Sequence, residues 1–143
     1  MNANIAVVDW SRHRKDLLAI RYTVFVGEQG VPIELERDEY DERALHLLVT
    51  DPDGQPIGTA RMLPEGHVGR MAVLPSWRKQ GIGSSMLREL IRIAGENGID
   101  RLFLNAQCEA ESFYRRFGFV AEGEVFADAG IAHRRMILPA DEV

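Results

Sequence analysis

The sequence is poor in cysteine and contains no long hydrophobic run. Cys108 is the only cysteine among 143 residues, so an intramolecular disulfide is excluded and no metal-ligand cluster is expected. No apolar stretch approaches the roughly 20 residues that span a membrane. The N-terminal stretch MNANIAVVDW lacks the charged and apolar regions of a secretory signal. We therefore expect a soluble cytoplasmic protein with no metal and no membrane partner.

Positive charge is also in short supply. The chain has 17 lysine and arginine residues against 22 aspartate and glutamate residues, which gives a net charge of −5. Nucleic-acid-binding domains normally carry a basic face, so no nucleic-acid partner is expected. The remaining composition is ordinary for a globular protein, and the length predicts a single domain over residues 1–143.

Hydrophobic periodicity in the first half of the chain predicts one helix and several strands. A strand at 5–8 precedes a helix that we expect Ser11 to cap. Its apolar stripe includes Arg21 and reaches Phe25, and Gly30 and Pro32 are expected to end it. The turn sequence DPDG predicts a β-hairpin over 44–63. A further strand is expected at 67–74.

The second half of the chain carries the clearest helix, in which Ile82, Met86 and Leu90 recur four residues apart. The later elements are then a buried strand at 101–106, a short helix at 109–117 and two strands at 119–126 and 131–138. The order β-α-β-β-β-α-β-α-β-β implies an α/β or α+β mixed sheet covered by helices.

The segment WRKQGIGSSML places Gly81 and Gly83 where a strand passes into a helix. Backbone N–H groups at such a turn can approach an anion, and the helix N-terminus adds about half a positive charge. The expected ligand group is a phosphate. A Rossmann site would need a third glycine at Met86, and a Walker loop would need a lysine after its last glycine, where Ser84 stands. From these residues alone, a glycine turn without a ligand is the alternative.

Two sequence blocks resemble the GNAT superfamily of N-acetyltransferases. MAVLP at 71–75 with RKQGIG at 78–83 is similar to its pyrophosphate-binding motif, and LNAQCEAESFYRRFGF at 104–119 is similar to its second conserved strand and helix. The blocks have the expected order and separation, and the resemblance covers about residues 4–138. The segments RYTVFVGEQGVP and AGIAHRRM further resemble the small bacterial ElaA-like group.

This resemblance implies the acyl-CoA N-acyltransferase fold, with two central strands splayed around the coenzyme and helices on both faces of the sheet. It implies acetyl-CoA as the donor, with strand backbone pairing the pantetheine arm, loop amides holding the pyrophosphate, and two side chains flanking the thioester. The implied cofactor-binding residues are Met71, Ala72, Val73, Arg78, Lys79, Gln80, Gly81, Ile82, Gly83, Ser84, Asn105 and Tyr114.

The family chemistry is direct transfer of the acetyl group to an amine within a ternary complex. By this resemblance Tyr114 would protonate the leaving thiolate, and a backbone N–H near Val73 would polarise the carbonyl. Cys108 could instead accept the acetyl group covalently, but direct transfer is the usual route in the family. The acceptor is expected to be a primary amine of a small molecule or peptide, and a homodimer through strand edges is a further expectation.

The general base is left open. Many relatives carry a glutamate in the strand where Gly69 and Arg70 stand here, a departure from the family pattern. Glu28 and His133 are the candidate catalytic residues for this role, with His46 or water as alternatives.

An acidic run follows the first helix. Its members are Glu34, Glu36, Asp38, Glu39, Asp41 and Glu42, with Arg37 among them. Such a run is usually solvated surface. Beside an acceptor pocket it would attract a cationic amine, and both interpretations are kept.

Two other functions are also open. RYTVF at 21–25 followed by ERDEYD at 36–41 resembles the start of acyl-homoserine-lactone synthases, whose chains are longer and generally lack the glycine loop. The other alternative is a coenzyme-A-binding module that regulates without turnover, against which Asn105 and Tyr114 argue.

Overall fold

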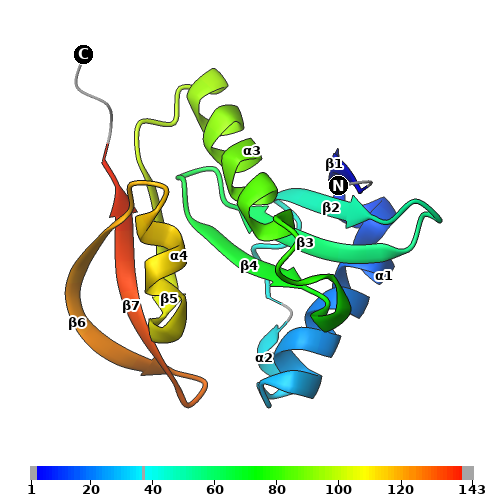
Figure 1. Cartoon of the computed structure of the whole chain (residues 1–143), viewed down its shortest axis with the longest axis horizontal. Coiled ribbons are helices and arrows are strands. Elements are labelled where there is room, and N and C mark those ends of the chain that lie inside the picture. The colour runs from blue at the N-terminus through cyan, green and yellow to red at the C-terminus, as the bar shows by residue number, and fades with distance from the viewer. Residues whose placement is uncertain (1–2, 37, 140–143) are drawn as a thin grey trace.

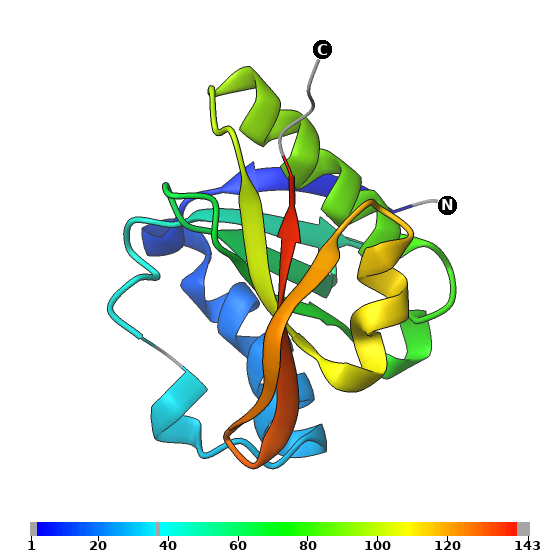
Figure 2. The same cartoon turned by 90° about the vertical axis from the view of Figure 1, so that its left-hand side faces the viewer.

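The computed structural model describes residues 3–36 and 38–139, which form two antiparallel sheets (Figures 1 and 2). The four-stranded sheet has the order β1-β2-β3-β4, with strands at Asn4–Val8, Leu45–Thr50, Pro56–Met62 and Val68–Val73. The three-stranded sheet has the order β5-β7-β6, with strands at Leu102–Gln107, Ile131–Leu138 and Val120–Asp128.

The helices are α1 (Trp10–Arg21), α2 (Ile33–Glu36), α3 (Ile82–Glu96) and α4 (Glu111–Arg115), with a π-helical segment at Tyr22–Glu28. The element order confirms the predicted one, except that the single turn of α2 was not anticipated. Among the described residues, no helix is long and apolar enough to cross a bilayer, and no three potential metal ligands group together.

The first helix differs from its prediction at both ends. Its N-cap is Asp9 rather than Ser11, because the Asp9 carboxylate accepts a hydrogen bond from the Arg12 N–H at 2.9 Å. The α-helix ends at Arg21 and wider π-helical turns continue it to Glu28, so the helical segment ends just before Gly30, as expected, but its last turns are not α-helical. Such turns often occur at functional sites, and this one ends beside the cavity described below.

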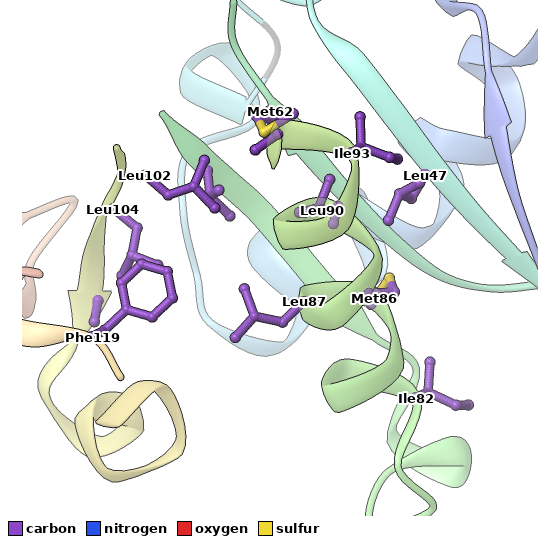
Figure 3. Close-up of a cluster of buried hydrophobic side chains, with 14 of the residues drawn as sticks. Leu47, Met62, Ile82, Met86, Leu87, Leu90, Ile93, Leu102, Leu104 and Phe119 are labelled. Atoms are coloured by element: carbon purple, nitrogen blue, oxygen red, sulfur yellow. The ribbon is translucent and has the colours of Figure 1, made fainter. Parts of the chain in front are cut away.

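Two helices cover opposite faces of the four-stranded sheet. On α3, Met86, Leu87 and Leu90 are fully buried in one apolar cluster with Leu47 of β2, and Leu87 points toward Leu104 and Phe119 (Figure 3). Leu48, the next residue of β2, packs instead with the apolar side chains of α1. Because successive strand residues face opposite sides, this alternation confirms the expected helices on both faces.

The central strands β4 and β5 touch at one end and then separate. His67 and Phe103 form a parallel bridge, and the Phe103 N–H donates to the Gly66 carbonyl at 3.0 Å. Beyond this bridge the two strands make no ladder within residues 38–139, and Figure 1 shows them diverging from their starts. A bulge in β4, where Arg70 has a φ of 47°, adds to the separation. The splayed arrangement implied by the family resemblance is confirmed.

Gly66 lies where β4 and β5 meet, and its replacement should destabilise the fold. It has a φ of +98°, and a Cβ there would lie 2.3 Å from the Arg101 carbonyl oxygen. Gly66→Ala should lower the free energy of unfolding by about 2–4 kcal/mol, measured by urea denaturation, because backbone strain and a backbone clash add. Gly54→Ala is the matched control, since Gly54 has a φ of +81° with nothing within 4 Å. Equal losses in the two variants would show that the place where β4 and β5 meet is not tightly packed.

Candidate active site

A cavity of about 590 Å³ lies between the splayed strands. Met71 of β4, Asn105 of β5, Tyr114 of α4 and His133 of β7 all line it, so four of the predicted site residues share one space. Gln29, at the end of the π-helical segment, forms part of the wall and accepts a hydrogen bond from Gln107 at 2.8 Å. That bond joins the end of the π-helical segment to the end of β5 at the wall of the cavity.

Tyr114 is a half-buried residue of an aromatic group, and its hydroxyl faces β4. Its ring meets Phe113 and Phe119 edge-on, at centroid distances of 5.0 and 5.9 Å. The hydroxyl lies 3.9 Å from the Met71 sulfur, a weak contact. Burial raises the pKa of Tyr114 to about 12, so the hydroxyl keeps its proton at neutral pH. This geometry suits a proton donor to a group placed beside β4.

A second cavity, of about 410 Å³, opens at the N-terminus of α3. Gly81 is the N-cap, with a φ of 84° and no side chain to accept the first helical N–H groups. The predicted residues among its lining are Val73, Arg78, Lys79, Gly81, Ile82, Gly83 and Ser84. The Gln80 side chain instead donates to the Ser76 carbonyl, and Ala72 is buried. The uncapped helix end presents N–H donors to this cavity, as an anion site requires.

Arg78, which lines this second cavity, already forms an ion pair within the protein. Its Nη1 and Nη2 donate to the Glu28 carboxylate at 2.7 and 2.5 Å, and its Nε donates to the Val73 carbonyl at 3.0 Å. The hydrogen bonds from Arg78 lower the pKa of Glu28, although slight burial opposes them. Glu28 is absent from the lining of the larger cavity. Both features disfavour Glu28 as a base, a role that stays a prediction.

The candidate histidines have different surroundings. His133 lines the larger cavity, and its Nδ1 lies 2.7 Å from the Ile131 carbonyl. If Nδ1 carries the proton for that bond, Nε2 is left as an acceptor. His46 is 1% exposed, stacks on Trp10 and bonds the Asp41 carbonyl through Nε2 at 2.7 Å. Burial lowers the pKa of His46. Its place in the core, outside both cavities, favours a structural role.

Six charged side chains form a closed ring beside the larger cavity, which we call the six-charge ring. Arginine and acid alternate around it, so its three positive and three negative charges cancel. The successive N–O distances are Arg21–Glu36 2.5 Å, Glu36–Arg70 3.4 Å, Arg70–Asp38 3.2 Å, Asp38–Arg61 2.7 Å, Arg61–Asp41 2.9 Å and Asp41–Arg21 2.9 Å. Every acid in the ring is therefore shared by two arginines.

The six-charge ring corrects both interpretations of the acidic run. Glu36 and Asp41 are buried, so they are neither solvated nor free to attract a cation. Burial acts to raise the pKa of Asp41, but hydrogen bonds and charges from Arg21 and Arg61 lower it overall, whereas burial leaves the pKa of Glu36 raised. The solvated interpretation holds only for the exposed members, which are Glu34, Glu39 and Glu42. Arg37 lies outside the described residues.

Sequence reasoning also missed the partners of this run. The signal available was Arg21, which the predicted first helix places on its apolar stripe. A buried arginine needs acidic partners, and the acidic run is the nearest supply in the chain.

Comparison with known proteins agrees with this architecture. A family model for the acetyltransferase (GNAT) domain matches residues 14–139. YjcF of Bacillus subtilis, named as an uncharacterised N-acetyltransferase, is 37% identical over 127 residues, which cover 86% of this chain and 90% of that protein.

Solved structures give the same result. An acyl-CoA N-acyltransferase from Pseudomonas aeruginosa matches with a TM-score of 0.85 and 29% identity, over 94% of this chain and 98% of the other. ElaA of Escherichia coli matches with a TM-score of 0.84 and 26% identity, over the same shares. The ElaA-like resemblance suggested by the sequence thus has a direct structural counterpart.

Proposed function

Because this chain belongs to the GNAT acetyltransferase family, we propose that it transfers an acetyl group from acetyl-CoA to a primary amine of a small molecule or peptide. One observation carries the proposal: neighbouring residues line the two cavities. Met71 and Tyr114 line the larger one, while Val73 and Phe113 line the one at α3. A ligand anchored at the helix end can therefore extend along β4 into the larger cavity.

The residues present suit coenzyme A. The uncapped N-terminus of α3 offers backbone donors for the pyrophosphate, and Lys79 and Arg116 add positive charge around the same cavity. One edge of β4 pairs with β3, and the splay leaves the other edge open for the amides of the pantetheine arm. Arg78 could exchange its Glu28 partner for a phosphate.

In the proposed reaction the neutral amine forms a C–N bond to the acetyl carbonyl carbon, and the C–S bond breaks. The coenzyme supplies the activated thioester. A backbone N–H near Val73 polarises the carbonyl oxygen, and the Tyr114 hydroxyl gives its proton to the departing sulfur. His133 Nε2 takes a proton from the amine, directly or through water. Held in one cavity, the reactants also gain from proximity, which is worth about 7–11 kcal/mol.

Turnover with a panel of primary amines tests this proposal. Mass spectrometry should detect an acetylated amine with acetyl-CoA as donor, and none with an acetylated carrier protein, the donor class of the lactone-synthase alternative. Coenzyme A binding without any acetylated amine across the panel would favour the regulatory module instead.

A substitution at Gly83 tests the phosphate-binding loop. A Cβ at Gly83 would lie 3.5 Å from the Phe113 ring, an ordinary contact, so Gly83→Ala should bind nearly as wild type. The extra methyl groups of Gly83→Val would crowd the second cavity, which Gly83 and Phe113 both line. We expect at least tenfold weaker acetyl-CoA binding, about 1.4 kcal/mol, by calorimetry. Gly95→Val, on an exposed turn of the same helix, controls for helix propensity, and unchanged affinity in Gly83→Val would contradict a ligand at this loop.

A further inference from the structure

Arg61 is a buried arginine with part of its hydrogen-bonding capacity unused. Its side chain is 8% exposed, and its bonds to Asp38 and Asp41 both leave from Nη1. Nε is buried and has no hydrogen-bond partner among residues 3–36 and 38–139. A buried N–H without a partner is unfavourable, so this edge of the guanidinium is suited to a ligand that completes it.

The residue opposite Arg61 is Gly69, which has no side chain. The two residues are paired across β3 and β4, so side chains at these positions share one face of the sheet. Nothing lies within 4 Å of the place where a Gly69 Cβ would be. Both residues line the larger cavity. The missing side chain therefore leaves a space in the wall of the cavity that Arg61 also lines.

A carboxylate matches this space chemically. The Nε–H and an Nη2–H of a guanidinium form a planar fork with the spacing of two carboxylate oxygens. A cationic group finds no free partner in the ring, because Asp38 and Asp41 are each already shared by two arginines. The fork therefore selects for an anionic group on the acceptor.

The position of Gly69 along β4 sets the length of that acceptor. Strands rise about 3.3 Å per residue and this stretch contains the bulge of β4, so Gly69 lies on the order of 10–13 Å from the Val73 backbone N–H that is expected to polarise the acetyl carbonyl. An α-amino acid carries its amine and its carboxylate on one carbon and cannot span this distance.

We propose that the acceptor is an amine with a carboxylate several carbons away, which Arg61 binds in the space beside Gly69. This inference rests on the proposed function and specifies its substrate class. The amine end then lies toward Tyr114 and His133, at the other end of the same cavity.

Matched acceptors test the proposal on the unaltered protein. The probes are γ-aminobutyrate, δ-aminovalerate and ε-aminocaproate. Each is compared with its carboxamide, which has the same length and the same amine but no negative charge. For the best-fitting length, kcat/KM for the acid should exceed that for the amide at least tenfold, about 1.4 kcal/mol. Amides that react as well as the acids at every length would overturn it.

Two substitutions at Gly69 test whether the preference for the acid over the amide arises beside Arg61, and they leave all six residues of the six-charge ring in place. The carboxylate of Gly69→Glu should occupy the fork of Arg61 and bring the acid-to-amide ratio close to one. Gly69→Ala leaves the fork open and should keep the preference. A preference that survives in Gly69→Glu would place the carboxylate site elsewhere and contradict the proposal.

Calorimetric binding of the same acid and amide pairs separates this inference from the proposed function. If no amine is acetylated, the proposed transfer reaction fails. Tighter binding of the acids, lost in Gly69→Glu, would still support the Arg61 site. Equal binding of acids and amides would overturn it, whether or not turnover is observed.

Discussion

Replacing Tyr114 with phenylalanine is expected to lower kcat by roughly 10²-fold or more while affinity for acetyl-CoA changes little. The substitution keeps the ring and its contacts with Phe113 and Phe119, so the fold should persist. It removes only the hydroxyl, whose raised pKa of about 12 keeps it protonated at neutral pH. The departing thiolate then has no positioned proton donor. Steady-state kinetics with parallel calorimetry measures both effects.

Tyr22→Phe is the matched control, because Tyr22 lies outside the lining of both cavities and its variant should retain full activity. If Tyr114→Phe loses affinity as much as rate, Tyr114 acts as a binding residue. If it retains full activity, solvent supplies the proton and the assignment is wrong.

Arg21→Met is expected to remove about 3–5 kcal/mol of the free energy of unfolding. The Arg21 side chain is 1% exposed and donates four hydrogen bonds to Glu36 and Asp41. Methionine has a similar length but leaves both buried acids short of a partner. Urea denaturation of the two proteins gives the difference.

Two controls make this result specific to the six-charge ring. Arg12→Met on the same helix removes an 83%-exposed arginine from its pair with Asp9 and should change stability by less than about 1 kcal/mol. Adding Asp41→Asn to Arg21→Met should recover part of the loss, because the two acids and two arginines that remain in the ring then cancel in charge. A loss in Arg21→Met no larger than that in Arg12→Met would mean that the ring contributes little.

The effect should also depend on pH with a definite sign. The folded protein lowers the pKa of Asp41, so that group stabilises the fold above its unfolded pKa of about 3.9, and the contribution is lost as the pH falls through the folded value. The difference between wild type and Arg21→Met should therefore narrow below about pH 4. A gap that stays constant down to pH 3 would argue against a charge-based effect.

The parts of the fold that depend on local pattern were predictable from the sequence. The spacing of Ile82, Met86 and Leu90 defines α3 because each turn of a helix repeats its buried face, and all three are buried in the structure. The turn before α3 was recognisable because Gly81 and Gly83 stand between a predicted strand and a predicted helix, and Gly81 takes a φ of 84° there. The existence of the first helix was predicted correctly, but its cap was not, since Asp9 and Ser11 are both good N-caps and local sequence does not distinguish them.

The parts that depend on distant residues were not predictable from local pattern. Arg61 and Asp38 are 23 positions apart, and Arg70 and Asp38 are 32 apart. Periodicity contains no information about which charges meet at such separations. The pairing of Arg61 with Gly69 depends in addition on the register of β3 and β4 around the bulge.

The six-charge ring also limits how this chain can diverge over generations. Because the three positive and three negative charges of the ring cancel, neutralising any one member leaves one charge in the ring uncompensated. The resulting loss of stability is a large fraction of the free energy of unfolding of a typical domain, which is about 5–15 kcal/mol. Sequences that remain stable must therefore substitute an acid and an arginine of the ring together or keep all six residues. Adaptation to new acceptors, in nature or in a directed-evolution library, should therefore proceed through cavity residues outside the ring, such as Gly69, His67 and Asp128.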